Sequence, residues 1–391
     1  MIAGHGGNCT ALAARLGCSR DAIIDMSSNL NPLGPPPGLE NFIRESVSAI
    51  RNLPQADAHD MVMAFGHYHD IDPARIMAAN GTTWFIYTLP AALKSRKMLI
   101  LGPTYSDYRD GCIMQGVDFD YSMAVKETRF TPDLDRVAML LDDPAAAYDT
   151  VVVCNPNNPT GALVQPSRIL DLVRCHPRVC FVVDESYLPF VDNAQSLSLV
   201  RESRFSNLVV LSSMSKVFTI PGLRTGFITA APEVISSLMT WYQPWSVNAL
   251  AQAAVVHLLE NGHAMEPFIR ETRAFVNREK ALFEKSLAGF SGLVLYPSST
   301  YFLLAELTCG ITSQEICRAV GDQRILIRDC ANFEGLSNRF VRFSLKTREI
   351  NMKLISVLAG LDAFRPLGKF SGKPMPARGV QGSIRDKEKP S

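Results

Sequence analysis

The sequence lacks the features that mark a secreted, membrane-spanning or metal-binding protein. Its nine cysteines are scattered, with no CxxC pair and no His/Cys set at zinc spacing, and Cys175 and Cys180 are the nearest pair. An odd cysteine count without a disulfide framework indicates reduced thiols in a cytoplasmic protein. No apolar stretch approaches the length of a membrane span, and Arg15 interrupts the first apolar helix pattern, which speaks against a signal peptide.

An excess of charge of one sign is missing as well. Lys and Arg number 39 against 38 Asp and Glu, a net charge of +1, so nothing predicts a nucleic acid or a membrane surface as a partner. Hydrophobic residues make up 47% of the 391 positions, enough for a well-buried core. The length favours one large and one small domain, and the size is that of an enzyme.

Four continuous apolar runs predict the strands of a buried, mostly parallel sheet. They cover residues 98–101, 150–154, 181–183 and 208–211. None shows the polar alternation of a half-exposed strand, so we expect both faces of the sheet to be covered, with helical stretches such as 168–174 as crossovers. Each run ends in a polar or glycine-containing loop. The carboxyl ends of parallel strands meet at one sheet edge, where α/β proteins bind their ligands.

A smaller α+β unit is predicted after the large sheet. Two long helices over 247–259 and 269–287 precede strands near 293–295, 301–304, 325–327 and 340–343 and a last helix over 351–363. Near the N-terminus, Thr10 is predicted to cap a helix over 11–16 that Gly17 ends.

The predicted organisation has four parts. An N-terminal arm over residues 1–38 joins the small domain, a large domain covers 39–260, and the small C-terminal domain covers 261–364. The tail over 365–391 is rich in Pro, Gly, Lys and Arg, and we expect it to be disordered.

The turn after the 208–211 run is the most informative stretch of the chain. It is small and rich in hydroxyl groups, and it contains a single lysine, Lys216, with Arg224 eight residues later beyond a Pro-Gly break. Burial and a neighbouring cation lower the pKa of an amine, which leaves a neutral nucleophile that can form a Schiff base. From this stretch alone, an ordinary loop lysine beside an arginine is the simpler interpretation. The residues at the other strand ends decide between this interpretation and a Schiff-base lysine.

Those strand ends offer the other groups that pyridoxal phosphate requires: an anion at the ring nitrogen, a phosphate cradle and a stacking partner. Asp184 ends the 181–183 strand and can hold the ring nitrogen protonated, although a helix cap is an equal reading of it alone. Asn158 and Tyr187 can hydrogen-bond the phenolic oxygen, and Tyr105 can stack on the ring or belong to the rim. The cradle would comprise Gly81, Thr82 and Thr83 at a helix start, with Ser213 and Arg224.

The order of these motifs resembles the fold-type I aminotransferase superfamily. Four further segments, over residues 4–8, 28–34, 244–250 and 324–332, look like the threonine-phosphate decarboxylase branch, which is similar to histidinol-phosphate aminotransferases. The resemblance covers nearly the whole chain. It implies a mostly parallel seven-stranded sheet in the large domain, a smaller α+β C-terminal domain, and a homodimer with its active site at the interface.

The resemblance also implies the chemistry. The expected reaction is the pyridoxal 5'-phosphate-dependent decarboxylation of L-threonine O-3-phosphate to (R)-1-aminopropan-2-yl phosphate for cobalamin biosynthesis, with Lys216 and Asp184 as catalytic residues. Arg328 and Arg342 match the arginines that bind the substrate's anionic groups. The predicted substrate-binding set is His5, Asn29, Asn158, Arg328 and Arg342.

The sequence departs from the family pattern at three places. Leu53 precedes Pro54 where relatives usually have a tyrosine that reaches the neighbouring subunit's cofactor phosphate. The phosphate turn reads Gly81-Thr82-Thr83-Trp84, where relatives often have an acidic residue, and Lys346 replaces an arginine.

Other functions stay open at the level of sequence. The runner-up is a histidinol-phosphate-type aminotransferase, and phosphoserine is an alternative substrate. A non-catalytic regulator on the same fold would need an added DNA-binding module, and no segment of that size precedes the first motif.

Overall fold

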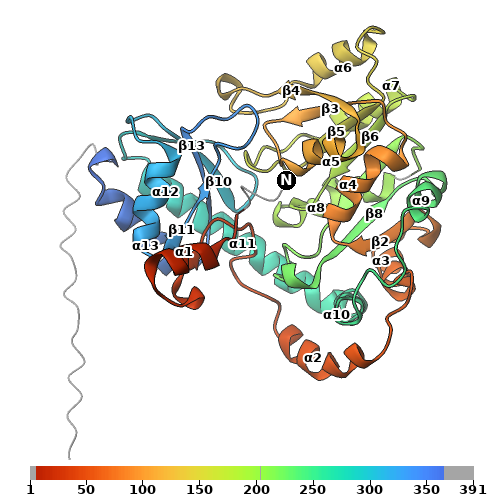
Figure 1. The fold of residues 1–391 in the computed structure, drawn as a ribbon, viewed down its shortest axis with the longest axis horizontal. Coiled ribbons are helices and arrows are strands. Elements are labelled where there is room, and N and C mark those ends of the chain that lie inside the picture. The colour runs from red at the N-terminus through yellow and green to blue at the C-terminus, as the bar shows by residue number, and fades with distance from the viewer. Residues whose placement is uncertain (1–5, 203, 365–391) are drawn as a thin grey trace, which may run out of the picture.

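The computed structural model describes residues 6–202 and 204–364, and a seven-stranded sheet forms the larger of its two parts (Figure 1). The sheet order is β2-β8-β7-β6-β5-β3-β4, and β8 runs opposite to the other six strands. The strands are β2 (Ile76–Asn80), β3 (Lys97–Gly102), β4 (Asp118–Met123), β5 (Thr150–Cys154), β6 (Cys180–Asp184), β7 (Leu208–Ser212) and β8 (Thr225–Thr229). The predicted mostly parallel sheet is confirmed.

The apolar runs form strands because both of their faces are buried. Along β5, Val151 and Val153 pack into one apolar cluster, while Val152 packs into another on the opposite face of the sheet. The first face is covered by α3 (His59–His69), α6 (Leu134–Asp142), α7 (Pro166–Cys175) and α10 (Ala249–Glu260), and the second by α4 (Thr82–Ala92), α5 (Asp107–Gln115) and α9 (Pro232–Met239). The shorter helices of this part are α2 (Leu39–Glu45) and α8 (Ala194–Leu197).

A four-stranded antiparallel sheet forms the second part, in the order β12-β13-β10-β9. Its strands are β9 (Leu293–Leu295), β10 (Phe302–Leu307), β12 (Arg328–Asp329) and β13 (Phe340–Ser344), and its helices are α12 (Ser313–Asp322) and α13 (Arg348–Ala359). The long helix α11 (Gly262–Leu287) connects the two parts, since its first half packs on the large part and its last turns pack on the second (Figure 1). The predicted C-terminal strands are confirmed.

The N-terminal segment packs on the second part. Helix α1 (Cys9–Leu16) is capped by Asn8, whose side chain accepts the Ala11 amide at 3.2 Å, so the prediction that Thr10 caps it was wrong. Strand β1 (Ile24–Asp25) pairs in parallel with β11 (Ile325–Leu326), which places residues 27–31 against the large sheet's edge. The predicted site residue His5 and the predicted disordered tail over 365–391 lie outside the described residues.

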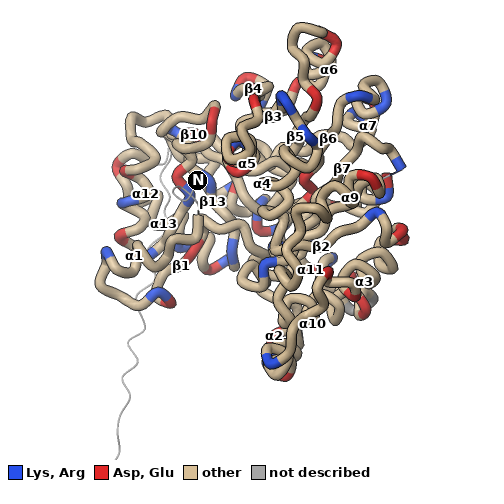
Figure 2. The backbone as a smooth tube through the Cα atoms, turned by 45° about the vertical axis from the view of Figure 1, so that its right-hand side comes forward, with Lys and Arg blue, Asp and Glu red and all other residues tan. Residues whose placement is uncertain are grey.

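Charged residues of both signs are interspersed over the molecule, in keeping with the small net charge (Figure 2). Within the described ranges, no helix has the length and apolar character needed to cross a membrane. The same ranges contain no group of three or more His, Cys, Asp or Glu side chains placed to hold a metal ion.

Candidate active site

A cavity of about 270 Å³ lies where the carboxyl ends of the large sheet's strands face the second sheet. Ten of the predicted site residues line it, although they come from distant parts of the chain: Asn29, Thr82, Thr83, Tyr105, Asn158, Asp184, Tyr187, Lys216, Arg328 and Arg342. The fold therefore brings the strand-end residues and the two arginines of the second sheet into one place.

The turn that carries Lys216 is held in place by the N-terminal segment. The Asn31 amide donates to the Lys216 carbonyl at 3.1 Å, and the Asn31 side chain donates to the Val217 carbonyl at 2.8 Å. Burial, followed by the positive charges of Arg224 and Arg342, lowers the pKa of the Lys216 amine to about 8. The amine is thus prepared to act as a neutral nucleophile, as the sequence predicted.

This lowered pKa predicts how the lysine reacts with an aldehyde. Only the neutral amine attacks, so the rate should rise about tenfold per pH unit below pH 8 and level off above it. A lysine with the ordinary pKa of 10.5 would still gain rate through that range. The check is the rate at which the visible absorbance of lysine-bound pyridoxal phosphate appears in cofactor-free protein. A rate that climbs without levelling up to pH 10.5 would contradict the assignment.

Asp184 is fixed by two hydrogen bonds at the end of β6. Its Oδ1 accepts the Ser186 amide at 2.9 Å, and its Oδ2 accepts the Tyr108 hydroxyl at 2.8 Å. Burial and the nearby carboxylate raise the pKa of Tyr108 well above its ordinary value, so Tyr108 stays a donor. Sequence reasoning missed Tyr108. No signal in the linear sequence marked it, because its hydroxyl reaches Asp184 from α5, a separate element.

The predicted phosphate cradle is only partly assembled on the cavity wall. Thr82 and Thr83 line the cavity at the start of α4, where unpaired backbone amides favour an anion. Gly81 lies against Arg224, since a Cβ atom built on Gly81 would stand 2.7 Å from a guanidinium nitrogen. Ser213 is not on this wall. It lines a second cavity, and its hydroxyl lies 2.8 Å from that of Ser215.

Arg328 and Arg342 face each other across the β12–β13 pair. Within the described residues neither makes an ion pair within 4.0 Å, and the buried Nε of Arg342 has no hydrogen-bond partner. Their guanidinium groups lie over the rings of Phe333 at 5.0 Å and Phe302 at 5.4 Å. Like charges directly opposite in a sheet repel, so this pair indicates a site for an anion.

Polar contacts connect Arg342 and the N-terminal segment to the strand ends. Arg342 donates to the Asn158 side chain through Nη1 and to the Ser27 carbonyl at 2.5 Å through Nη2. The Asn29 side chain donates to the Tyr187 hydroxyl at 3.3 Å. These contacts place predicted cofactor and substrate residues in one hydrogen-bonded network.

This donor set fits pyridoxal phosphate. It combines an amine of lowered pKa, a buried carboxylate, a helix start with two threonines beside an arginine, and a tyrosine on the cavity wall. A family model described as aminotransferase class I and II matches residues 21–358. The chain belongs to this aminotransferase family. It is therefore an enzyme that uses pyridoxal phosphate, which confirms the predicted fold class and cofactor.

Relatives with two different activities resemble this chain. It is 30% identical to the threonine-phosphate decarboxylase of Salmonella typhimurium over 90% of this chain and 95% of that one. The solved L-threonine-O-3-phosphate decarboxylase of Porphyromonas gingivalis has a TM-score of 0.76 and 29% identity, covering 86% and 98% of the two chains. The histidinol-phosphate aminotransferase of Clostridium acetobutylicum has a TM-score of 0.78 and 27% identity, with the same coverages.

Two of the departures from the family pattern lie outside the cavity wall. Leu53 is 77% exposed on the surface. Lys346 is half-buried beside Asp25 and Cys9, where desolvation lowers its pKa. Neither side chain lines the cavity of this chain.

Proposed function

We propose that this enzyme decarboxylates L-threonine O-3-phosphate to (R)-1-aminopropan-2-yl phosphate, a reaction of cobalamin biosynthesis. The observation that carries the proposal is the pair Arg328 and Arg342, two buried cations that face the cavity without an acidic partner among the described residues. Threonine phosphate brings a carboxylate and a phosphate group that carries between one and two negative charges. The similarity to the Salmonella and Porphyromonas decarboxylases supports the same substrate.

The cofactor would be held by residues from both ends of the cavity. Thr82, Thr83, Gly81 and Arg224 would hold its phosphate, Tyr105 would stack on the ring, and Asn158 and Tyr187 would hydrogen-bond its phenolic oxygen. Asp184, oriented by Tyr108, would keep the ring nitrogen protonated. When bound, pyridoxal phosphate supplies an electron sink for the bond that breaks at Cα. Lys216 would anchor it and transfer protons at the reacting carbon.

The substrate-binding residues would determine whether the substrate loses carbon dioxide or its Cα hydrogen. Lys216 and Asp184 serve both reactions, so they do not discriminate. Arg328, Arg342 and Asn29 set where the phosphate and carboxylate groups lie, and thereby which bond at Cα is aligned for cleavage. His5, in the same N-terminal segment, is proposed as a further substrate contact.

The test compares threonine phosphate, serine phosphate and histidinol phosphate side by side, each with and without 2-oxoglutarate. Threonine phosphate should release carbon dioxide without the oxoacid. Serine phosphate lacks one methyl group, which lowers the specificity constant by about 10- to 200-fold. A strict requirement for 2-oxoglutarate, with glutamate as a product, would contradict the proposal and identify a histidinol-phosphate-type aminotransferase.

Changing Arg342 to lysine is expected to lower kcat/KM for threonine phosphate about 100-fold. Lysine keeps the charge but loses the planar fork that binds Asn158, Ser27 and an anion together. Steady-state kinetics measures the effect, with Arg318→Lys on the exposed side of α12 as the matched control. Equal kinetics for Arg342→Lys and the control would remove Arg342 from the substrate site.

We also propose that the enzyme is a homodimer, joined through an exposed apolar patch formed by Val47, Ile50, Leu53 and Trp245. Ile50 is 65% exposed, and the Trp245 amide donates to the Ala56 carbonyl at 2.9 Å, which brings the two segments together. Large apolar side chains gathered on a surface mark an interface.

Changing Ile50 to aspartate should therefore shift the dimer toward monomer, because a charge buried in an apolar interface goes unpaired. Sedimentation velocity measures the shift. The control is Met139→Asp, at an equally exposed position of α6 outside the patch. A dimer that survives Ile50→Asp but dissociates in the control would place the interface elsewhere.

A further inference from the structure

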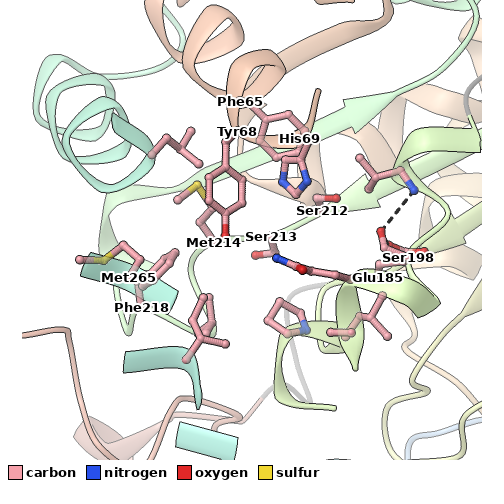
Figure 3. A pocket seen from close by; sticks show the side chains of 18 of the residues that line it. Phe65, Tyr68, His69, Glu185, Ser198, Ser212, Ser213, Met214, Phe218 and Met265 are labelled. Atoms are coloured by element: carbon pink, nitrogen blue, oxygen red, sulfur yellow. Dashed lines mark hydrogen bonds between the residues drawn. The ribbon is translucent and has the colours of Figure 1, made fainter. Parts of the chain in front are cut away.

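A second cavity, of about 210 Å³, lies behind the turn that carries Lys216 (Figure 3). Neighbouring residues alternate between the two cavities. Asp184 and Lys216 line the first, whereas Glu185 and Val217 line the second. The residues of this second cavity have no part in the proposed reaction, and Ser213, which the sequence predicted in the phosphate cradle, lies here instead. An occupant would contact the back of the turn that positions the reactive lysine.

One side of the second cavity suits an aromatic ring. Its apolar wall is formed by Met214, Phe218, Leu259 and Met265. A cavity of about 150 Å³ in a protein core binds benzene, so 210 Å³ admits a benzene ring with one substituent. Methionine sulfur atoms pack favourably at the edges of aromatic rings, and this wall has two of them.

The other side of the second cavity is polar. Figure 3 shows His69, Ser212, Ser213 and Glu185 gathered there, away from Phe218 and Met265. The Glu185 carboxyl group accepts the Ser198 hydroxyl at 2.6 Å and the Leu199 amide at 2.7 Å. In the described part of the chain, no hydrogen-bond partner is found for the His69 ring nitrogens.

The protonation states of His69 and Glu185 favour a ligand whose polar end is uncharged. Burial and Arg201 lower the pKa of His69 to about 4, so at neutral pH its ring offers one donor and one acceptor. Burial raises the pKa of Glu185 to about 7. The wall carries two arginines, Arg201 and Arg273, and two acidic residues, Glu185 and Glu266, so it does not present charge of a single sign to an ionic ligand.

We propose that this cavity binds a small neutral aromatic molecule with one hydroxyl group, the ring against the methionine and phenylalanine side chains and the hydroxyl at His69. A hydroxyl group both donates and accepts, which matches a neutral imidazole beside a carboxyl group. The site lies outside the cofactor cavity and does not depend on which substrate the enzyme decarboxylates.

The experiment uses phenol and toluene, which have nearly the same shape and differ in the hydroxyl group. Affinities for the full, cofactor-loaded chain are measured by calorimetry or ligand-observed NMR. Both should bind at millimolar concentration. Changing His69 to phenylalanine should shift the ratio of the two affinities about fivefold in favour of toluene, the effect of losing one neutral hydrogen bond. His69→Gln, which keeps a donor and an acceptor, should preserve the ratio.

Two outcomes decide where the probes bind. Changing Ala194 to methionine fills the cavity and should weaken both probes, while Met139→Ala on the distant helix α6 should leave them unchanged. Continued toluene binding by His69→Phe would show that this variant's cavity is intact. Absence of phenol binding, phenol affinity unaffected by Ala194→Met, or an unchanged ratio in His69→Phe would overturn the proposal.

Discussion

Replacing Lys216 with alanine is expected to lower the turnover of threonine phosphate by about 10⁴-fold, because one residue both anchors the cofactor and transfers protons. The variant should also lose the visible absorbance of lysine-bound pyridoxal phosphate. Absorbance spectra, and the mass of the borohydride-reduced protein, measure the anchoring separately from activity. The alanine side chain leaves the hydrogen bonds from Asn31 to this turn intact, because they go to the backbone carbonyls of residues 216 and 217.

The matched control for this variant is Lys353→Ala, on the exposed side of α13. It should keep both the absorbance and the turnover. An unchanged absorbance band in Lys216→Ala would refute the assignment of the anchoring lysine, whatever the residual activity.

Changing Asp184 to asparagine is expected to lower turnover by about 10³-fold, the upper range for removal of one electrostatic group from an active site. An amide cannot keep the ring nitrogen protonated, so the electron sink is weakened. Cofactor binding should persist, because the phosphate cradle is formed by other residues. Tyr108→Phe, which removes one hydrogen bond to Asp184, should lower turnover about tenfold.

Steady-state kinetics under cofactor saturation measures both variants, with Asp171→Asn on the exposed side of α7 as the control. Activity should be lowest in Asp184→Asn, intermediate in Tyr108→Phe and highest in the control. Equal activity of Asp184→Asn and the control would show that the carboxylate serves only as a structural cap.

The central strands could be predicted because their signal is continuous burial. The runs at β3, β5, β6 and β7 are apolar on both faces, and the structure buries both faces. Lys216 and Asp184 could be chosen as candidates because they follow the ends of such strands, and the structure places both on the wall of one cavity. The two arginines came from the resemblance, since periodicity does not reveal that residues 328 and 342 pair across two short strands.

The strands β2 and β8 were missed because packing, rather than composition, makes them strands. β8 reads Thr-Gly-Phe-Ile-Thr, and Gly226 within it allows the start of α4 to approach so closely that a Cβ atom would stand 2.3 Å from the Thr82 amide. Tyr108 and the second cavity were missed for a similar reason. Each depends on side chains meeting from separate elements, which a linear pattern does not encode.

The most direct test of the account follows the hydrogens at the reacting carbon during turnover of threonine phosphate in deuterium oxide. Decarboxylation keeps the original Cα hydrogen and replaces the carboxylate with one solvent hydrogen. The account therefore predicts aminopropanol phosphate with a single deuterium at C1, formed together with carbon dioxide and without 2-oxoglutarate. Retention of the carboxylate, loss of the Cα hydrogen and a need for 2-oxoglutarate would contradict it.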